Sequence, residues 1–404
     1  MKKTKIIWIL SIIVLVVLLV FGIRFYVKNL RGIWPLVETP STGITQMADP
    51  TTYKNLNLNL PAGFSISIFA QNVPGARVMV FDNSGNIWLS ETGQGKLVEL
   101  IVKDGKVQSQ KIILTGLKNP HGLAFDPQNP NVLYIAEETQ ISKMIIDPTV
   151  GKLEKVIDLP KGGRHFTRTL GFGPDGRLYV SIGSTCDVCN EADPRNASVY
   201  SLNKDGSDFK QLAKGLRNSV FFAFNKNDGK IWATEMGHDY LGDNLPPDEI
   251  NTIDPKSSAV LNYGWPICYG KNIHDTTFDK NTYIRNPCML PFEIPSYFDI
   301  QAHSAPLGLS FVPENSSWPK DYAHNLIVAF HGSWNRTVPT GYKVVRFVLD
   351  SKENILRQED FITGWLTSSG AIGRPVDIVF DNQGGLYITD DNAGVIYKVI
   401  YNSK

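Results

Sequence analysis

The sequence predicts an all-β fold, a six-bladed β-propeller, preceded by one N-terminal transmembrane helix. The first observation is a repeat in which an apolar strand ends at Phe and is followed by a turn and a second apolar strand. The six copies are FDNSGNIWLSE from Phe81, FDPQNPNVLYIAEE from Phe125, FGPDGRLYVSIG from Phe172, FNKNDGKIWATE from Phe224, FVPENSSWPKDYAHNLIVAF from Phe311 and FDNQGGLYITDD from Phe380. Each copy is followed by another strand-like run, and 34 Gly and 24 Pro supply turns along the whole chain. Sheet units that repeat about every 45 residues or more indicate a propeller.

The second observation concerns how the ring would close. The early segment FSISIF, residues 64–69, is predicted to pair with the last copy near residues 396–400. Such pairing removes the exposed edges of the first and last sheets. A pair of β-sandwiches is the alternative architecture, but the shared Phe-turn-strand pattern favours the propeller.

The third observation is the N-terminus, where Lys2, Lys3 and Lys5 precede an unbroken apolar run over residues 6–23. A membrane-spanning helix needs about 20 apolar residues. No small-residue cleavage site follows, which favours an uncleaved signal anchor over a cleaved signal peptide. We therefore expect a membrane anchor over residues 1–27, a Pro-bearing linker over 28–52 and the catalytic propeller over 53–404.

The net charge of +1 gives no indication of a nucleic-acid surface or an acidic tail. The four cysteines allow half a zinc site, a redox C-x-x-C motif or structural disulfides. An even count after an export-like segment favours the disulfides Cys186–Cys189 and Cys268–Cys288. Together with the anchor, they predict a membrane-anchored protein whose catalytic domain lies on the extracytoplasmic side.

Basic and amide side chains precede the Phe residues of the repeats. In a propeller the strand that ends at each Phe would be innermost, so these residues would meet at one mouth of the central channel. They are Arg77, His121, His165, Arg168, Arg217, Asn218, His303 and Arg374. One such residue alone is most simply a hydrogen-bonded loop residue. A cluster of unpaired cations is costly, so this one predicts an anionic ligand with several carboxylates or phosphates.

Longer segments then resemble a known family. These are GGRHFTRTLGFGPDGRLYVSIG, GLRNSVFFAFNKNDGKIWATEMGHDYLGDNLPPDEIN, NYGWPICYG, HGSWNRTVPTGYKVVRF and GRPVDIVFD, which span the chain from about Pro120 onward. The chain resembles the pyrroloquinoline quinone (PQQ)-dependent glucose/sorbosone dehydrogenases, which are six-bladed propellers. TCDVC and the loop HDYLGDNLPPDE look closest to the L-sorbosone dehydrogenase-like branch. The resemblance implies PQQ, a planar orthoquinone with three carboxylates, as the anionic ligand.

The resemblance also implies roles for individual residues. His165 matches the general base that takes a sugar hydroxyl proton, and Arg217 matches a catalytic cation beside the quinone oxygens. The remaining cofactor-binding candidates are His121, Arg168, Asn218, His303, Arg336 and Arg374. The resemblance places Ca²⁺ on cofactor atoms and the backbone carbonyls of Gly237 and His238, oxygen ligands that suit this ion. Asp239, Asp243, Asp248 and Glu249 follow on the same loop and are interpreted as a solvated acidic loop or a second calcium site.

The functional expectation is a membrane-anchored quinoprotein dehydrogenase that oxidises an aldose or related sugar by hydride transfer to PQQ. Its electrons would pass to a quinone or a cytochrome of the respiratory chain. A calcium-dependent propeller hydrolase of the lactonase type is one alternative, but it needs carboxylates and amides along the axis. A non-catalytic extracellular binding propeller is another, and it would give no reason for His165 and Arg217 to hold matching positions.

Overall fold

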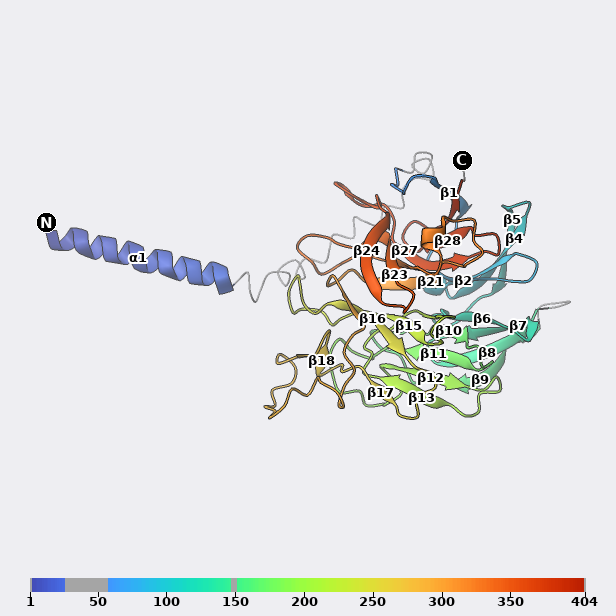
Figure 1. The fold of residues 1–404 in the computed structure, drawn as a ribbon, viewed down its shortest axis with the longest axis horizontal. Helices are drawn as coiled ribbons and strands as arrows, with labels where there is room; N and C mark the ends of the chain where they lie inside the picture. The colour runs from blue at the N-terminus through green and yellow to red at the C-terminus, as the bar shows by residue number, and fades with distance from the viewer. Residues whose placement is uncertain (1, 26–56, 147–150, 403–404) are drawn as a thin grey trace.

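The structure is a computed structural model that describes residues 2–25, 57–146 and 151–402 (Figure 1). The predicted linker over residues 28–52 and the predicted domain start at Tyr53 lie outside the described residues. The β-domain consists of six sheets that follow one another along the chain.

The sheets of the first three blades each begin with the strand that ends at or beside a repeat Phe. Blade 1 contains β2 (Ala76–Phe81), β3 (Ile87–Glu91), β4 (Lys96–Lys103) and β5 (Lys106–Leu114). Blade 2 contains β6 (Leu123–Asp126), β7 (Asn129–Ala136), β8 (Gln140–Ile145) and β9 (Glu154–Asp158). Blade 3 contains β10 (Leu170–Phe172), β11 (Leu178–Ile182), β12 (Ser198–Leu202) and β13 (Lys210–Lys214), to which β17 (Leu261–Asn262) adds in parallel.

The last three blades follow the same order. Blade 4 contains β14 (Phe222–Phe224), β15 (Ile231–Glu235), β16 (Asp248–Ile253) and β20 (Phe298–Ile300). Blade 5 contains β21 (Pro306–Phe311), β22 (Leu326–Phe330), β23 (Lys343–Leu349) and β24 (Ile355–Ile362). Blade 6 contains β27 (Pro375–Phe380), β28 (Leu386–Asp390), β29 (Val395–Tyr401) and β1 (Phe64–Gln71). Two short hairpins lie in the connections: β18 (Cys268–Tyr269) with β19 (Ile273–His274) between β16 and β20 of blade 4, and β25 (Leu366–Thr367) with β26 (Gly370–Ala371) between blades 5 and 6.

The ring closes as predicted. β1 pairs antiparallel with β29 from Phe64↔Tyr401 to Gln71↔Val395, so the first strand completes the last sheet. This pairing confirms the six-bladed propeller and excludes the pair of β-sandwiches. The closure joins the two ends of the β-domain through backbone hydrogen bonds.

Turn chemistry explains why each repeat folds back after its Phe. Gly85 and Gly176 have φ values of 82° and 76°, in the left-handed region that glycine adopts without a steric penalty. In the first repeat, one carboxylate oxygen of Asp82 accepts hydrogen bonds from the backbone N–H groups of Ser84 and Asn86, at 2.8 and 2.9 Å. The turn residues therefore fix where the second strand begins.

The innermost strands of neighbouring blades approach each other closely. The loop residues that precede these strands therefore lie around one central channel. An added Cβ at Gly122, before β6, would lie 2.4 Å from the carbonyl oxygen of Arg168, before β10. Gly308 in β21 is equally close to β27, with 2.5 Å to the carbonyl oxygen of Val376. The indoles of Trp88 and Trp232 fill the space farther out and are fully buried. Burial of such large aromatic side chains contributes much of the core's hydrophobic stabilisation.

The N-terminal helix α1 (Lys2–Phe25) requires a correction. Within the described residues, no helix is long and apolar enough to cross a membrane. The predicted transmembrane helix, the membrane anchor and the membrane-anchored location inferred from it were therefore wrong.

Candidate active site

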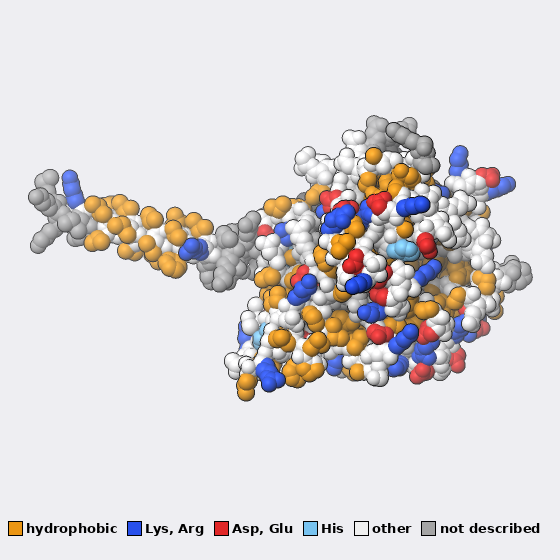
Figure 2. Space-filling model, viewed as in Figure 1, with side chains coloured by type: hydrophobic (Ala, Val, Ile, Leu, Met, Phe, Trp, Pro, Cys, Tyr) orange, Lys and Arg blue, Asp and Glu red, His pale blue; other side chains and the backbone are white. Residues whose placement is uncertain are grey.

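A cavity of about 350 Å³ lies where the loops before the innermost strands meet. Its charged and histidine lining consists of Arg77, Arg164, Arg217, Arg374, His165, His303, His331, Asp239 and Asp248. Its volume is in the range of small-molecule sites. The structure thus brings together six residues of the predicted rim, which are Arg77, His165, Arg217, Asn218, His303 and Arg374. On the face shown in Figure 2, basic and acidic side chains are interspersed and form no patch of one sign.

Two residues of the predicted rim lie beneath the cavity and do not line it. His121 is fully buried, and its Nδ1 lies 3.2 Å from the Thr169 hydroxyl. Arg168 is also fully buried and donates to the carbonyl oxygens of His165, Thr167 and Pro160. The Arg168 guanidinium therefore holds the segment that carries His165. Because it is buried, it cannot contact a ligand in the cavity.

Arg336 does not line the cavity either. Its guanidinium donates to the carbonyl oxygen of Asp243, to that of Ala302 at 3.3 Å and to Asn244 Oδ1 at 3.2 Å. The bonds to Asp243 and Asn244 connect the loop between β22 and β23, residues 331–342, to the loop between β15 and β16, residues 236–247, and the bond to Ala302 reaches the segment between β20 and β21. The predicted cofactor-binding cation is thus a cross-link between two loops.

The two predicted metal-binding positions differ in where they face. Gly237 lines the cavity, and a Cβ added there would lie 2.6 Å from Pro246 Cγ and 2.7 Å from the Pro247 carbonyl oxygen. The His238 side chain is buried and lies 2.5 Å from Asp275, with its Nδ1 2.8 Å from the Asp239 carbonyl oxygen. The hydrogen bonds of the His238 ring engage both of its nitrogens, so the backbone carbonyls are the groups that this pair could offer to a metal.

The loop after Gly237 is not a solvated acidic loop. Asp239, Asp243, Asp248 and Glu249 are all buried. Asp248 accepts from the backbone N–H groups of Gly237 at 3.1 Å and Ala305 at 2.8 Å, while burial raises its pKa to about 7. Asp243, Asp248 and Glu249 accept hydrogen bonds from backbone N–H groups, whereas Asp239 accepts from side chains. The sequence pattern alone does not distinguish such roles from exposure.

His165 is held as a neutral imidazole. Burial, followed by the charges of Arg217 and Arg164, lowers the pKa of His165 to about 2. Its Nδ1 lies 2.7 Å from Ser184 Oγ, whose proton is donated to the Cys186 carbonyl oxygen at 2.7 Å. The hydroxyl must then accept a hydrogen bond from Nδ1–H, which leaves Nε2 as the unprotonated nitrogen. The site therefore provides a base whose free lone pair is on Nε2.

Arg217 is anchored by Asp187, which the sequence analysis did not identify, and by Asp239, which it interpreted as part of a solvated loop or a calcium site. It donates through Nε to the Asp187 carbonyl oxygen at 2.8 Å and through a terminal nitrogen to Asp187 Oδ1 at 2.6 Å. The same terminal nitrogen lies 3.2 Å from Asp239 Oδ2, and Arg164 donates to that oxygen at 2.6 Å. Burial raises the pKa of Asp239 to about 6, whereas Arg217 lowers that of Asp187 despite its partial burial. Arg217 and Arg164 are therefore paired cations, not isolated ones.

The opposite side of the cavity contains His331, a histidine that the sequence analysis missed. His331 Nε2 lies 2.8 Å from Asp391, and Arg77 donates to the other oxygen of Asp391 at 2.8 Å. Burial and the charge of Arg374 lower the pKa of His331 to about 4. Arg374 donates to the carbonyl oxygens of His331 and Gly332. The only sequence signals were His331 at the start of HGSWNR and the acidic pair that ends the last repeat.

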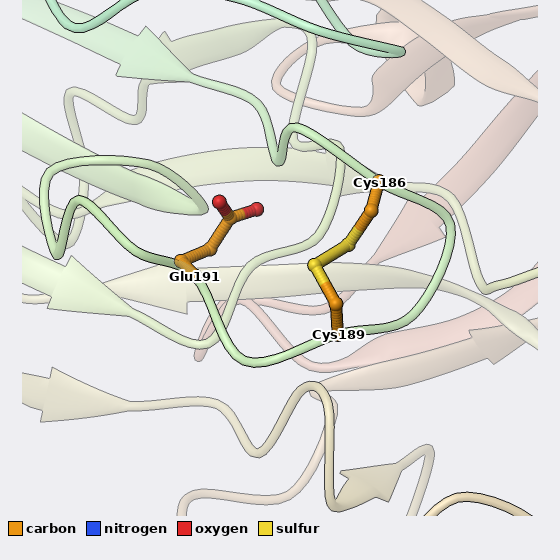
Figure 3. Close-up of side chains that lie close together, drawn as sticks. All are labelled: Cys186, Cys189 and Glu191. Atoms are coloured by element: carbon orange, nitrogen blue, oxygen red, sulfur yellow. A yellow bond between two sulfur atoms is a disulfide. The ribbon is translucent and has the colours of Figure 1, made fainter.

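Both predicted disulfides are present, and one of them borders the site. Cys186–Cys189 and Cys268–Cys288 have S–S distances of 1.96 and 1.98 Å. Figure 3 shows the Cys186 and Cys189 side chains turned toward each other, with Glu191 on the same loop. Glu191 accepts hydrogen bonds from the backbone N–H and hydroxyl of Thr185 at 2.6 and 2.7 Å. This geometry excludes the zinc and free-thiol alternatives for the C-x-x-C segment.

Comparison with known proteins agrees with this architecture. An uncharacterized protein of Borreliella burgdorferi is 33% identical over 363 residues, which cover 85% of this chain and 91% of that protein. A pyrroloquinoline quinone-dependent pyranose dehydrogenase of Coprinopsis cinerea is 24% identical over 414 residues, covering 85% of this chain and 54% of that enzyme, so the chain spans about half its length.

Solved structures share the fold. The holo form of the PQQ domain of the Coprinopsis cinerea pyranose dehydrogenase has a TM-score of 0.73 at 21% identity and covers 85% of this chain and 96% of that one. The calcium structure of the Trichoderma reesei enzyme of carbohydrate-active family AA12 has a TM-score of 0.74 at 20% identity and covers 85% and 97%. A family model described as TrAA12-like matches residues 58–402. The chain therefore belongs to the TrAA12-like family, and its PQQ-dependent dehydrogenase relatives confirm the resemblance drawn from the sequence.

Proposed function

We propose that the propeller is a quinoprotein dehydrogenase that oxidises an aldose or related sugar and passes the electrons to a respiratory quinone or cytochrome. The observation that carries the proposal is a neutral His165 with a free Nε2, held between arginines in a cavity of a TrAA12-like propeller. Bound PQQ would supply the orthoquinone that accepts a hydride from the sugar carbon.

The cavity residues fit such a cofactor. Four arginines line the cavity, and aspartates pair with three of them, Arg77, Arg164 and Arg217. Arg374 donates to the backbone carbonyls of His331 and Gly332, which carry no compensating charge, so its guanidinium suits a carboxylate of an anionic cofactor. The Asn218 side chain is also unsatisfied, because its Oδ1 is buried without a hydrogen-bond partner and its Nδ2 contacts only Met236 Sδ, at 3.5 Å. A buried amide without partners is expected to meet a polar ligand. Arg217 and Asn218 would hold the quinone oxygens, while Arg77 and Arg374 would hold carboxylates.

The chain's own part in the reaction follows from the protonation state of His165. Its Nε2 takes the hydroxyl proton of the sugar while the carbon–hydrogen bond of the same carbon breaks and a carbonyl forms. Ser184 keeps the other nitrogen protonated, so the accepting lone pair stays on the cavity side. Arg217 is fixed by Asp187 and Asp239 before substrate arrives, and its charge stabilises negative charge that develops beside it.

A calcium ion on the backbone carbonyls of Gly237 and His238 remains part of the proposal. Gly237 lines the cavity and packs against Pro246 and Pro247, which leave no space for a Cβ at this position. Carbonyl oxygens are suitable ligands for calcium. Chelation should therefore lower cofactor binding, and added calcium should restore it.

A lactonase-type hydrolase is less well supported. That chemistry needs several carboxylates converging on one ion. Among the described residues, the only groups of three metal-capable side chains are the two that contain the disulfide cysteines. Asp239 and Asp248 line the cavity but are engaged by guanidinium groups and backbone N–H groups.

Reconstitution tests the proposal. The full chain is mixed with PQQ and calcium, and reduction of an artificial dye is followed over a panel of aldoses. Dye reduction that requires both cofactor and sugar would support the dehydrogenase, and His165→Ala should lower turnover by about 10³-fold or more while PQQ binding is retained. Failure of the wild-type protein to bind PQQ would overturn the proposal, and full activity of the variant would remove the base assignment.

A further inference from the structure

The disulfide ring of residues 186–189 contacts the catalytic side of the cavity through its main chain. The Cys186 carbonyl oxygen accepts from the Ser184 hydroxyl at 2.7 Å, and this hydroxyl fixes the tautomer of the proposed base. The Asp187 carbonyl oxygen accepts from Arg217 Nε at 2.8 Å, and Asp187 Oδ1 accepts from a terminal nitrogen of Arg217 at 2.6 Å. Two neighbouring residues of the ring thus hold both proposed catalytic side chains.

Asp187 also joins this ring to two other parts of the chain. Its Oδ1 accepts from the backbone N–H of Asp239 at 3.0 Å, and the Trp265 indole N–H donates to its carbonyl oxygen at 3.3 Å. Asp239 belongs to the loop of residues 236–247, and Trp265 to the connection between β16 and β20. A change in the conformation of the ring would therefore reach both of these segments as well as Arg217.

The two disulfides differ in their access to a reductant. Cys186 and Cys189 are partly exposed, whereas Cys268 and Cys288 are 6% and 1% exposed. Thiol–disulfide exchange requires a thiolate to reach a sulfur atom, so burial of both cysteines protects the longer bridge until the segment around it opens. The bridge at residues 186–189 is open to attack in the folded protein.

The loop that carries this bridge has little other regular structure. None of the residues 183–197, which join β11 to β12, belongs to a helix or strand. The disulfide closes a ring with a sequence separation of 3, and its reduction would free a loop that few regular backbone hydrogen bonds hold. A carboxylate oxygen of Glu191 and the two sulfur atoms lie within 4.8 Å of one another (Figure 3). In the reduced form this carboxylate can accept the S–H hydrogen of either cysteine.

We propose that the Cys186–Cys189 disulfide is a redox-modification site at which a protein dithiol lowers the activity of the propeller. A thiolate of the dithiol attacks one of the two sulfurs, so the Cys186–Cys189 bond breaks and a mixed disulfide forms. The second thiol of the reductant then displaces the protein sulfur and closes the reductant's own disulfide. Two electrons and two protons pass to the protein, which then carries two thiols. The effect on turnover rests on the proposed dehydrogenase, whereas the selective reduction does not.

Selective reduction tests the site itself. The full chain is treated with dithiothreitol well below its thermal midpoint and alkylated with iodoacetamide at intervals, and mass spectrometry of the peptides gives the reduced fraction of each bridge. Cys186–Cys189 should be reduced at least about tenfold faster than Cys268–Cys288, because only the former is accessible without opening of the fold. Equal rates for the two bridges, or reduction of neither before unfolding, would overturn the proposal.

The structural consequence is measured without cofactor or turnover. The indole N–H resonance of Trp265 is observed in protein with isotopically labelled tryptophan and assigned by its loss in Trp265→Phe. Because this indole donates to Asp187, its resonance should move at the rate at which the Cys186–Cys189 bridge is reduced, and oxidised glutathione should return it. A resonance that stays in place after complete reduction would overturn the proposal even if the protein proves to be a dehydrogenase.

Turnover supplies the functional measurement, after the dithiothreitol has been removed. Protein in which only Cys186–Cys189 is reduced should have a kcat about tenfold lower, because the loop no longer holds His165 and Arg217 in their catalytic geometry. Reoxidation by oxidised glutathione should restore kcat. An unchanged kcat in the reduced protein would contradict the proposal. If the wild-type protein has no turnover, the proposed dehydrogenase fails, and the Trp265 resonance still decides whether reduction changes the site.

The matched controls are the two double variants. Cys268→Ser/Cys288→Ser keeps the accessible bridge and should show the same fold loss of kcat after treatment. Cys186→Ser/Cys189→Ser lacks that bridge, so the same treatment should change its kcat by less than about twofold. An equal loss in this second variant would assign the inhibition to another effect of the reductant and contradict the proposal.

Discussion

His165 Nδ1 and Ser184 Oγ lie 2.7 Å apart, and the Ser184 hydroxyl donates a hydrogen bond to the Cys186 carbonyl oxygen, also at 2.7 Å. A single hydroxyl thus connects the proposed base to the loop closed by the Cys186–Cys189 disulfide. Because the hydroxyl is fully buried, no solvent competes for either bond. The proton on His165 is thereby assigned to Nδ1, and Nε2 is left to act as the base.

We expect Ser184→Ala to lower kcat about tenfold with little change in KM, because the imidazole loses the partner that fixes its tautomer and ring orientation. Ser184→Thr retains a hydroxyl and should recover part of the activity. Nitrogen NMR of the labelled imidazole gives an independent measurement, since the fraction of Nδ1–H tautomer should fall in Ser184→Ala. A tautomer population and kcat that both match the wild-type protein would show that Ser184 has no positioning role.

The sequence predicted the arrangement of the site better than its contacts. The recurring Phe-turn-strand pattern sets the blade register, and register alone places His165, Arg217 and Arg374 before innermost strands. The blade register does not determine in which direction a long side chain points. Arg336 was therefore predicted to bind the cofactor, but its guanidinium donates to the carbonyl oxygen of Asp243. His238 was predicted to offer its backbone carbonyl to a metal, and nothing in the sequence indicated that its side chain turns to Asp275.

The acidic partners escaped prediction for a different reason. Asp187 and Asp239 are distant in sequence from each other and come from loops, where carboxylates are usually solvated. Only the folded ring brings them to the same guanidinium. The premise of an unpaired cationic cluster was therefore incomplete, because Asp187, Asp239 and Asp391 already neutralise part of it.

Removal of the Arg217 side chain should reduce stability as well as activity. Arg217 is 4% exposed, and its loss removes the guanidinium partner of the partly buried Asp187 carboxylate and one of the two guanidinium partners of the buried Asp239 carboxylate. We expect Arg217→Ala to lower the free energy of unfolding by about 3–5 kcal/mol, and kcat to fall more than sugar affinity does. Arg217→Lys keeps the charge and should restore part of the stability but little of kcat.

The matched control for Arg217 is an exposed pair of the same chemistry. Arg195 and Asp193 are joined at 2.7 Å with side chains 41% and 36% exposed. Arg195→Ala should change the free energy of unfolding by less than about 1 kcal/mol, because solvent screens such pairs. The free energies of unfolding are measured by urea unfolding. Equal losses of this free energy in the two variants would mean that burial of the Arg217 ion pairs contributes nothing to stability.

The pH dependence of turnover should reflect Asp239 and not His165. With the pKa of His165 lowered to about 2, the imidazole stays neutral across the working range. Burial raises the pKa of Asp239 to about 6, so its carboxylate is charged at pH 7 and becomes protonated as the pH falls below that value. Arg217 and Arg164 then lose an anionic partner, and kcat should fall along an acid limb with a midpoint near pH 6.

Two variants show which carboxyl group causes the acid limb of the kcat profile. Asp239→Asn should lower kcat at pH 7.5 and abolish the limb near pH 6, because the titrating group is removed. Asp248 also faces the cavity, and burial raises its pKa to about 7, so Asp248→Asn serves as the comparison. Persistence of the limb near pH 6 in Asp239→Asn would assign it to another group and contradict the role of the Asp239 ion pairs.

The two disulfides should differ in what their removal affects. Cys268–Cys288 closes a loop with a sequence separation of 20, and Cys186–Cys189 one of 3. Chain entropy predicts losses of about 3 and about 2 kcal/mol for the two double Cys→Ser variants, and dithiothreitol should lower the thermal midpoint of the wild-type protein. The shorter loop contacts the catalytic side of the cavity directly, because Asp187 accepts from Arg217 and the Cys186 carbonyl accepts from Ser184, whereas the longer loop meets the site through Asp275, which lies 2.5 Å from His238. Cys186→Ser/Cys189→Ser should therefore lose more kcat than Cys268→Ser/Cys288→Ser while losing less stability. The opposite order of kcat losses, measured well below both thermal midpoints, would mean that the disulfide loop does not position the catalytic side of the cavity.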